Sequence, residues 1–220
     1  NLSATSSAAF IAEMSRNIDV SYISVAGAPA IELDFVAGTV SNLNLMGDGS
    51  GIGITAHHSR GSGAIEISES SVVGYSVALK MHGNSGEVYN PRLISSNNMF
   101  SGATAVSGDG RNFVSINDDF SGDIELTSDV DMISEFYDST YQDITVTGSA
   151  SAIFWNTLSF SATLDGLPVS AIVSVSSPVS EETYISELSN TPSLTVPIAT
   201  YDSSESSIAT LLTVSATAEG

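Results

Sequence analysis

The chain has 220 residues, of which 42% are hydrophobic, with no cysteine and 25 acidic against 5 basic side chains. This length suffices for one large domain or two small ones. A net charge of −20 repels phosphate groups, which argues against nucleic acids and anionic membrane surfaces as partners. The lack of cysteine excludes disulfides and thiolate metal sites, and the absence of an 18-residue apolar run argues against a membrane span.

The chain begins without Met and without a signal-peptide pattern, so we expect a processed form or a piece of a longer protein. Residues 1–20 show no polar capping pattern ahead of the region that follows. We therefore expect the first strands of that region to present open edges.

Short runs of alternating apolar residues recur between residues 21 and about 147, at intervals of 20 to 28 residues. Alternation predicts β-strands, and the Gly, Ser, Asn and Asp residues between the runs predict turns. A period of this length is typical of a solenoid. Helical and leucine-rich repeats lack support, because neither a sustained 3.6-residue period nor a Leu-x-x-Leu-x-Leu spacing is present. We predict an all-β chain with a single-stranded parallel β-helix of about six rungs over residues 1–148. The principal runs are Ile31/Leu33, Ile52/Ile54, Val77/Leu79, Thr104/Val106, Ile124/Leu126 and Ile144/Val146.

Small polar residues precede several of these runs at a constant offset. Ser70, Asn97, Asn117 and Asp138 each stand three residues before the first position of a repeat. Side chains of this kind hydrogen-bond to nearby backbone groups. The pattern predicts one polar corner of the solenoid.

The repeat ends near Gly148, and the remaining residues 149–220 alternate in short segments. Asp165-Gly166 is a hairpin turn signal between two of these segments. Further alternating segments cover 193–198 and 208–216. We predict a small Ig-like β-sandwich over residues 149–220.

Two stretches resemble known families. Asn98-Met-Phe-Ser-Gly and Ser70-Ser-Val-Val-Gly-Tyr-Ser-Val resemble right-handed parallel β-helix repeats of the NosD-like and carbohydrate-binding/sugar-hydrolase class. Leu164-Asp-Gly-Leu-Pro-Val is similar to the start of carboxypeptidase-regulatory-like or Ig-like modules. The first resemblance implies a class that holds lyases, glycosidases, tailspikes and non-catalytic surface proteins. The combination implies a large secreted prokaryotic surface protein.

Four residues follow the inward positions of successive rungs at one edge: His57, His82, Asp109 and Asp129. If the register holds, they lie about 5 Å apart. Imidazoles and carboxylates together suit a divalent metal, although each residue is also an ordinary turn residue. The acidic composition further indicates weak Ca²⁺ binding shared between chains.

Glycan recognition is the second possibility that the sequence leaves open. Tyr75, Lys80 and Tyr89 are candidates for glycan binding along one edge of the solenoid. A lyase would need a base beside a cation, and a glycosidase would need two carboxylates at a defined separation. No phosphate loop, dinucleotide fingerprint or serine-hydrolase motif is present. We therefore expect no enzyme, with a polysaccharide lyase or glycosidase as the alternative.

The terminal segment suggests how the chain assembles. Residues 208–216 are apolar on one face, and Ile208, Leu211 and Val214 are the expected contact residues. We predict a secreted or cell-surface structural protein, part of a surface layer, adhesin or filament, that joins copies of itself or other surface modules through strand edges. The alternatives are a glycan-binding or glycan-cleaving module and a plain spacer.

Overall fold

The computed structural model describes residues 2–3, 10–13, 18–26, 30–34, 36–57, 64–82, 93–109, 112–180, 182–204, 206–208 and 211–218. Throughout these residues the regular secondary structure is β-strand. The same residues hold no helix that is long and apolar enough to cross a membrane. Seventeen of the strands that these residues form belong to one hydrogen-bonded sheet, and the others form sheets of two and three strands.

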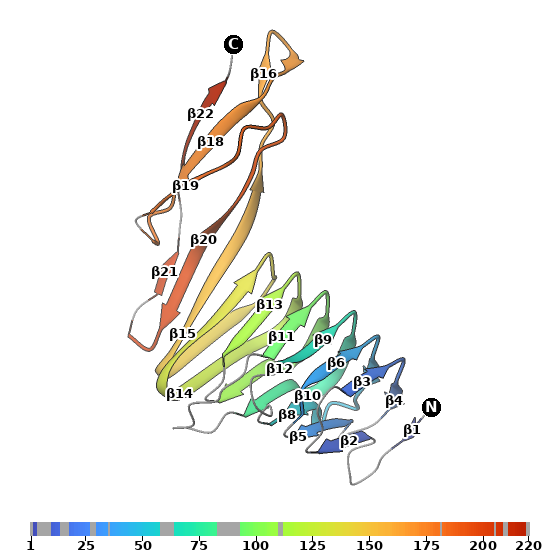
Figure 1. The fold of residues 1–220 in the computed structure, drawn as a ribbon. Helices are drawn as coiled ribbons and strands as arrows, with labels where there is room; N and C mark the ends of the chain where they lie inside the picture. Colours follow the sequence, from blue (N-terminus) through green and yellow to red (C-terminus); the bar gives the residue numbers. More distant parts are fainter. Residues whose placement is uncertain are drawn as a thin grey trace.

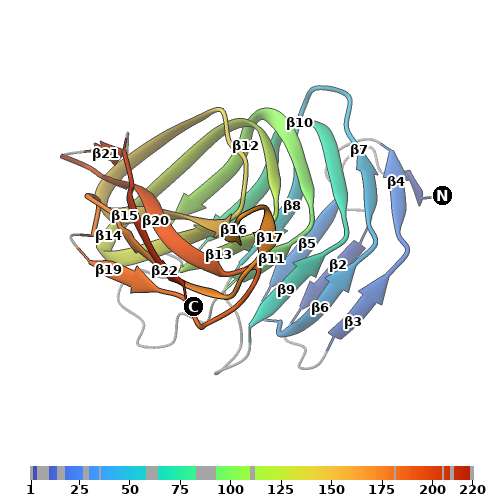
Figure 2. The ribbon, with the colours of Figure 1, turned by 90° about the horizontal axis from the view of Figure 1, so that it is seen from above.

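Most of the large sheet is parallel and is arranged in three faces (Figures 1 and 2). Face A consists of β2 (Phe10–Glu13), β5 (Ile31–Asp34), β8 (Ile52–Ala56) and parts of β10 (Ser71–His82), β12 (Met99–Asp109), β14 (Asp119–Tyr137) and β15 (Asp143–Ser159). Face B consists of β3 (Ile18–Ser21), β6 (Gly38–Ser41), β9 (Ile65–Ser68), β11 (Leu93–Ser96), β13 (Phe113–Ile116) and further parts of β14 and β15. Face C consists of β1 (Leu2–Ser3), β4 (Ser24–Ala26), β7 (Asn44–Met46) and the first residues of β10, β12 and β14.

The chain winds around a common interior, because β14 takes part in all three faces. The predicted alternating runs lie beside one another on face A: Ile54 is paired with Leu79, and Leu79 with Val106. A register shift then places Val106 beside Ile124. The fold is thus all-β with a large parallel sheet, which is compatible with the predicted β-helix.

One corner of each circuit is formed by a residue with left-handed backbone conformation. Asn97, Asn117 and Asp138 have φ of 54°, 54° and 49°, and Asn and Asp adopt this region more readily than most residues. The backbone N–H of Asn97 donates to the carbonyl of Ile116 in the next circuit. These three predicted corner residues are confirmed. Ser70 lies one residue past the corner position, which Glu69 occupies with φ of 52°. The hydroxyl of Ser70 still makes the expected backbone hydrogen bonds, because it accepts from the N–H of Leu43 and donates to the carbonyl of Ser68.

Just past this corner, a ladder of polar side chains runs through the interior. It consists of Ser70, Asn98, Asp118 and Ser139, in successive circuits. The backbone N–H of Ser70 donates to Oδ1 of Asn98 at 2.8 Å, and that of Asn98 donates to Oδ1 of Asp118 at 2.8 Å. Backbone donors that would otherwise be buried without acceptors are satisfied in this way.

The core changes in character along the stack. Early circuits bury aliphatic side chains such as Ile31, Leu33 and Ile54. Later circuits bury aromatic rings that stack between neighbouring strands, as Phe136 and Phe154 do at 4.4 Å between ring centroids. Identical positions in parallel neighbours lie directly beside each other, so this stacking follows from the register.

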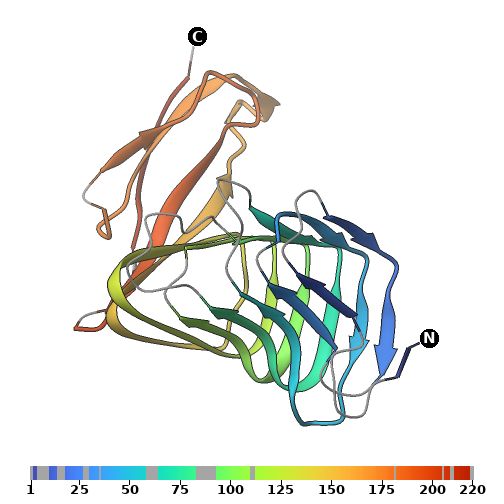
Figure 3. The ribbon, with the colours of Figure 1, turned by 60° about the horizontal axis from the view of Figure 1, so that its bottom comes forward.

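At its C-terminal end the large sheet turns antiparallel. β15 is parallel to β14 on one side and antiparallel to β20 (Ser193–Asp202) on the other. β21 (Ser206–Ile208) pairs with β20. β18 (Ala171–Ser176) pairs with β19 (Thr183–Ile185) and β22 (Thr213–Ala218). These strands form an arm that departs from the parallel region in Figures 1 and 3.

The predicted Asp165-Gly166 hairpin is confirmed within this arm. It joins β16 (Thr163–Leu164) to β17 (Leu167–Pro168), with φ of 52° and 83° at its two central residues. The sandwich expected for 149–220 is present only as small antiparallel sheets. The expected boundary between residues 148 and 149 falls inside β15, which runs unbroken from Asp143 to Ser159.

Candidate functional site

The outer surface of face A carries a column of ionisable side chains. The rings of His57 and His82 stack with centroids 5.1 Å apart and 11° between their planes. Nδ1 of His82 lies 3.9 Å from Oδ2 of Asp109, and Nε2 of His57 lies 3.7 Å from Oε1 of Glu32. From one end to the other, the column therefore consists of the carboxylate of Glu32, the imidazoles of His57 and His82, and the carboxylate of Asp109. Protonation of either ring would add an ion pair of the partly exposed, weakly stabilising kind.

Three of the four predicted metal ligands belong to this column, and Asp129 does not. The register places Thr127 beside Asp109, and Asp129 lies two residues further along β14. Among the described residues no three His, Asp or Glu side chains come together in a way that could hold a metal ion. Sequence spacing alone missed the register shifts between β12 and β14, which displace the later circuits.

Of the predicted glycan-binding residues, Tyr75 and Lys80 belong to the described residues, and these two do not form a common surface. The structure contradicts the role of Tyr75, because its side chain is buried with 2% exposure. A backbone irregularity at Gly74, which has φ of 74°, turns the ring inward against Gly47 and Gly53. Burial raises the pKa of Tyr75 to about 12. Lys80 is half-buried beside Thr55 and Ser107, and Tyr89 lies outside the described residues.

The predicted assembly residues are all at the surface of the arm. Ile208, Leu211 and Val214 are 58%, 77% and 48% exposed. The single strand expected for 208–216 is divided: Ile208 ends β21 on the large sheet, and Val214 belongs to β22 on the three-stranded sheet. These strands pair within the chain, but their apolar side chains stay exposed.

A further surface, which the sequence reasoning missed, lies where face B meets the arm. We call it the junction surface and define it by its apolar members. In one outward column Ile116 is paired with Tyr137 and Tyr137 with Trp155, and in the neighbouring column Val114 and Ile153 both pair with Glu135. The junction surface consists of Val114, Ile116, Ile133, Tyr137, Ile153 and Trp155.

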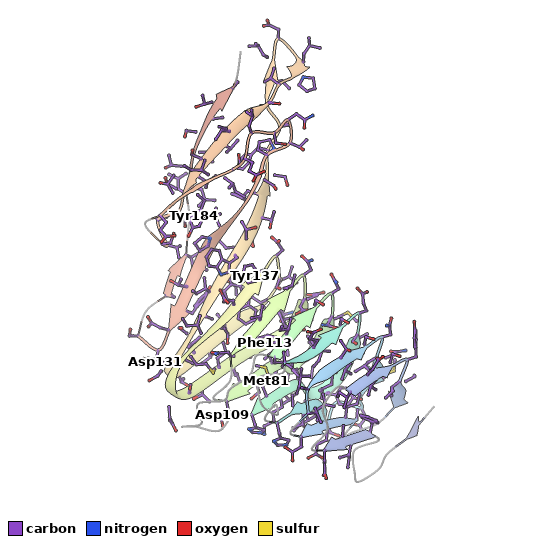
Figure 4. The ribbon with its side chains drawn as sticks, in the orientation of Figure 1. Met81, Asp109, Phe113, Asp131, Tyr137 and Tyr184 are labelled. Carbon is purple, nitrogen blue, oxygen red and sulfur yellow. The ribbon has the colours of Figure 1, made fainter. Side chains whose placement is uncertain are left out.

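Ring contacts join this surface to the arm. Tyr137 and Trp155 stack with centroids 5.7 Å apart and 9° between their planes. Trp155 meets Tyr184 of β19 edge-on at 6.3 Å, and Figure 4 shows Tyr137 on the parallel region and Tyr184 on the arm. The buried indole N–H of Trp155 finds no acceptor in the part of the chain that the structure describes. Ring packing therefore holds this side chain in place.

The junction surface contains a shallow, open hollow of about 370 Å³. Two carboxylates, those of Asp131 and Glu135, stand at its edge, one on each side of Ile133 in β14. The phenol of Tyr137 donates to Oε1 of Glu135 at 2.9 Å. The lining of the hollow comprises Asn112, Val114, Asp131, Ile133, Glu135 and Ile153.

A sequence signal for this surface existed. In a half-buried strand only every second residue is apolar, but residues 153–155 read Ile-Phe-Trp without a break. Phe154 fills the core, so Ile153 and Trp155 must point outward together. The same holds for β14, where the outward Ile133 follows the buried Met132 and the outward Tyr137 follows the buried Phe136.

Comparison with known proteins gives no assignment: no protein family, no curated protein and no solved structure matches this chain. The resemblance to NosD-like and Ig-like modules accordingly contributes an expectation of architecture. The structure supports an all-β chain with a long parallel sheet compatible with a solenoid.

Proposed function

We propose that this chain is a non-enzymatic structural protein of the cell surface or extracellular space. In this proposal a parallel β-helix is followed by a small β-sandwich-like arm, and open strand edges join the chain to copies of itself or to other surface modules. The observation that carries the proposal is the environment of β22, the last described strand.

β22 is paired along one edge only within the described residues. Six residue pairs connect it to β18, and its other edge faces no described strand. All six of its side chains are exposed. An uncovered strand edge offers unpaired N–H and C=O groups to another chain.

The arm also lacks part of its apolar cover at β22. Val214 is paired with Val175, so both side chains point to the same side of the sheet. Val175 is fully buried, whereas Val214 is 48% exposed. The residues that cover the apolar face over β18 therefore do not extend over β22. A strand from a neighbouring chain would continue both the hydrogen bonding of the sheet and its apolar face.

Calcium has a place in this proposal as a mediator between acidic chains. A charge of −20 makes identical chains repel each other. A divalent cation shared between their carboxylates would lower that repulsion. Assembly would then depend on Ca²⁺ without a dedicated site within one chain.

The proposal of a non-enzymatic role is supported by the position of Asp118, the one buried carboxylate among the described residues. Asp118 lies in the interior ladder, bonded to Asn98 and Ser115, and is 2% exposed. It serves the packing of the circuits and is closed to a substrate.

The first experiment is negative-stain electron microscopy of the purified chain with Ca²⁺ and with a chelator. We expect filaments or sheets, more abundant with Ca²⁺. Val214→Lys should reduce assembly, because a charge on the open face of β22 opposes strand addition. Leu164→Lys is the matched control, since it also replaces an exposed apolar residue of the arm, 60% exposed, at the β16–β17 hairpin.

Dispersed monomers under both conditions would reject the assembly proposal. Filaments that form equally well from wild type and Val214→Lys would retain assembly but move the contact away from β22. Removal of residues 208–220 tests the same contact without introducing a charge.

A further inference from the structure

The outward column of face B changes its chemistry abruptly along the stack. In register, it reads Ser21, Ser41, Ser68 and Ser96 and then Ile116, Tyr137 and Trp155. Hydroxyl side chains suit a solvated sheet, whereas a change to large apolar side chains indicates a surface that something covers. The change begins at the circuit that approaches the arm.

The shape and charge of the junction surface define what would fit there. Ile133 is 52% exposed and Ile116 is 38% exposed, so apolar area remains open beside the hollow. The carboxylates of Asp131 and Glu135 flank Ile133, and Lys80, the one lysine or arginine among the described residues, is paired with neither. An aliphatic side chain between two carboxylates on one face of a strand complements an extended segment with the pattern basic-x-aliphatic-x-basic.

Two other occupants fit less well. Sugar rings bind by stacking on open aromatic faces, but Tyr137 and Trp155 stack on each other, and Trp155 also meets Tyr184. A second copy of the chain has only 5 basic against 25 acidic side chains, so it offers few cationic side chains to Asp131 and Glu135.

We propose that the junction surface binds an extended segment of a partner protein with the pattern basic-x-aliphatic-x-basic, in which x is a polar residue. The basic and aliphatic side chains stand at every second position and therefore point to one face of the segment. The aliphatic side chain enters the hollow beside Val114, Ile133 and Ile153, and the two basic side chains meet Asp131 and Glu135. This contact is separate from the strand edge at β22 and brings a different, cationic partner to the chain.

The chain carries its own reporter for this contact, because Trp155 is its single tryptophan. The probe is a capped Lys-Ser-Val-Ser-Lys peptide, and the readout is Trp155 fluorescence in a titration at low salt. We expect saturable binding that weakens as salt rises, since the charges lie at the surface. A Glu-Ser-Val-Ser-Glu peptide should not bind, and a Lys-Ser-Ser-Ser-Lys peptide should bind far more weakly.

Two variants with matched controls locate the contact. Ile133→Ser should weaken binding about tenfold, the effect of losing 1.4 kcal/mol, and Asp131→Asn about threefold. Ile11→Ser replaces another half-exposed isoleucine, 48% exposed, at the far end of the parallel region. Asp123→Asn removes an exposed carboxylate from another face of the same strand, β14. Neither control should change binding.

Equal binding of the Lys-Ser-Ser-Ser-Lys peptide, or equal losses in the controls, would overturn the proposal in favour of general attraction to an acidic protein. Absence of any binding by the Lys-Ser-Val-Ser-Lys peptide would overturn it as well. If cellohexaose changed Trp155 fluorescence and Ile133→Ser removed the effect, the junction surface would be a glycan site instead.

Discussion

Replacement of Asp118 by asparagine should stabilise the protein at neutral pH. Asp118 is 2% exposed, and burial raises the pKa of its carboxyl although hydrogen bonds from Ser115, Ser95 and Asn98 partly oppose this. Oδ2 of Asp118 contacts the hydroxyl of Ser115 at 2.7 Å, Ser115 contacts that of Ser139 at 2.8 Å, and Ser139 donates to the carbonyl of Tyr137.

Burial explains the direction of the pKa shift. A carboxylate that leaves water loses its hydration, and the hydrogen bonds that Asp118 accepts from Ser115 and Asn98 replace that hydration only in part. An asparagine is uncharged, has the same shape and can still accept from Asn98. Burial of an incompletely compensated polar group costs about 1–2 kcal/mol, and Asp118→Asn should gain about that amount.

The gain has a defined pH dependence. Because the pKa of Asp118 is raised in the folded state, the folded protein binds more protons than the unfolded chain above the unfolded pKa of about 3.9. Wild-type stability therefore falls as pH rises from there to the folded pKa. The Asn variant lacks this component, so the difference between the two proteins should vanish below about pH 3.9 and be largest at neutral pH.

Urea unfolding at several pH values, followed by Trp155 fluorescence, measures the difference. Asp123→Asn is the control, because it removes an exposed carboxylate of the same strand and reports the general effect of lowering the net charge. If Asp118→Asn were less stable than wild type at neutral pH, or if its advantage were the same at pH 3.5, the assignment of the cost to the buried charge would be wrong.

Three further substitutions test the parallel region by urea unfolding. Asn98→Ala should destabilise by about 3 kcal/mol, because its buried side chain bonds to several groups of neighbouring strands. Gly122→Ala should destabilise more than Gly49→Ala: both have positive φ, but only at Gly122 would the new methyl lie 2.2 Å from a carbonyl oxygen, that of Gly102. Phe136→Ala should cost about 3–5 kcal/mol, because the ring is fully buried between stacked neighbours; unchanged stability in any case would contradict the packing described.

The strands of the parallel region could be predicted from the alternation of apolar and polar residues, because only the inward positions must be apolar. Ile54, Leu79 and Val106 recur at intervals that the strands then place side by side. The corner formed by Asn97, Asn117 and Asp138 was predictable from the residue types, because few other residues adopt a left-handed backbone readily. The Asp165-Gly166 hairpin was equally local. The alternation within each run, the corner residues and the hairpin depend on residues a few positions apart, so the sequence alone determined them.

Register and orientation were decided by the tertiary structure. One irregularity at Gly74 turns Tyr75 from an expected surface residue into a core residue, and register shifts between β12 and β14 remove Asp129 from the column of His82. A one-residue slip moves a side chain to the opposite face of a sheet. The junction surface likewise depends on which strands become neighbours: Trp155 and Tyr184 are distant in sequence and meet only because β15 joins the parallel sheet to the arm.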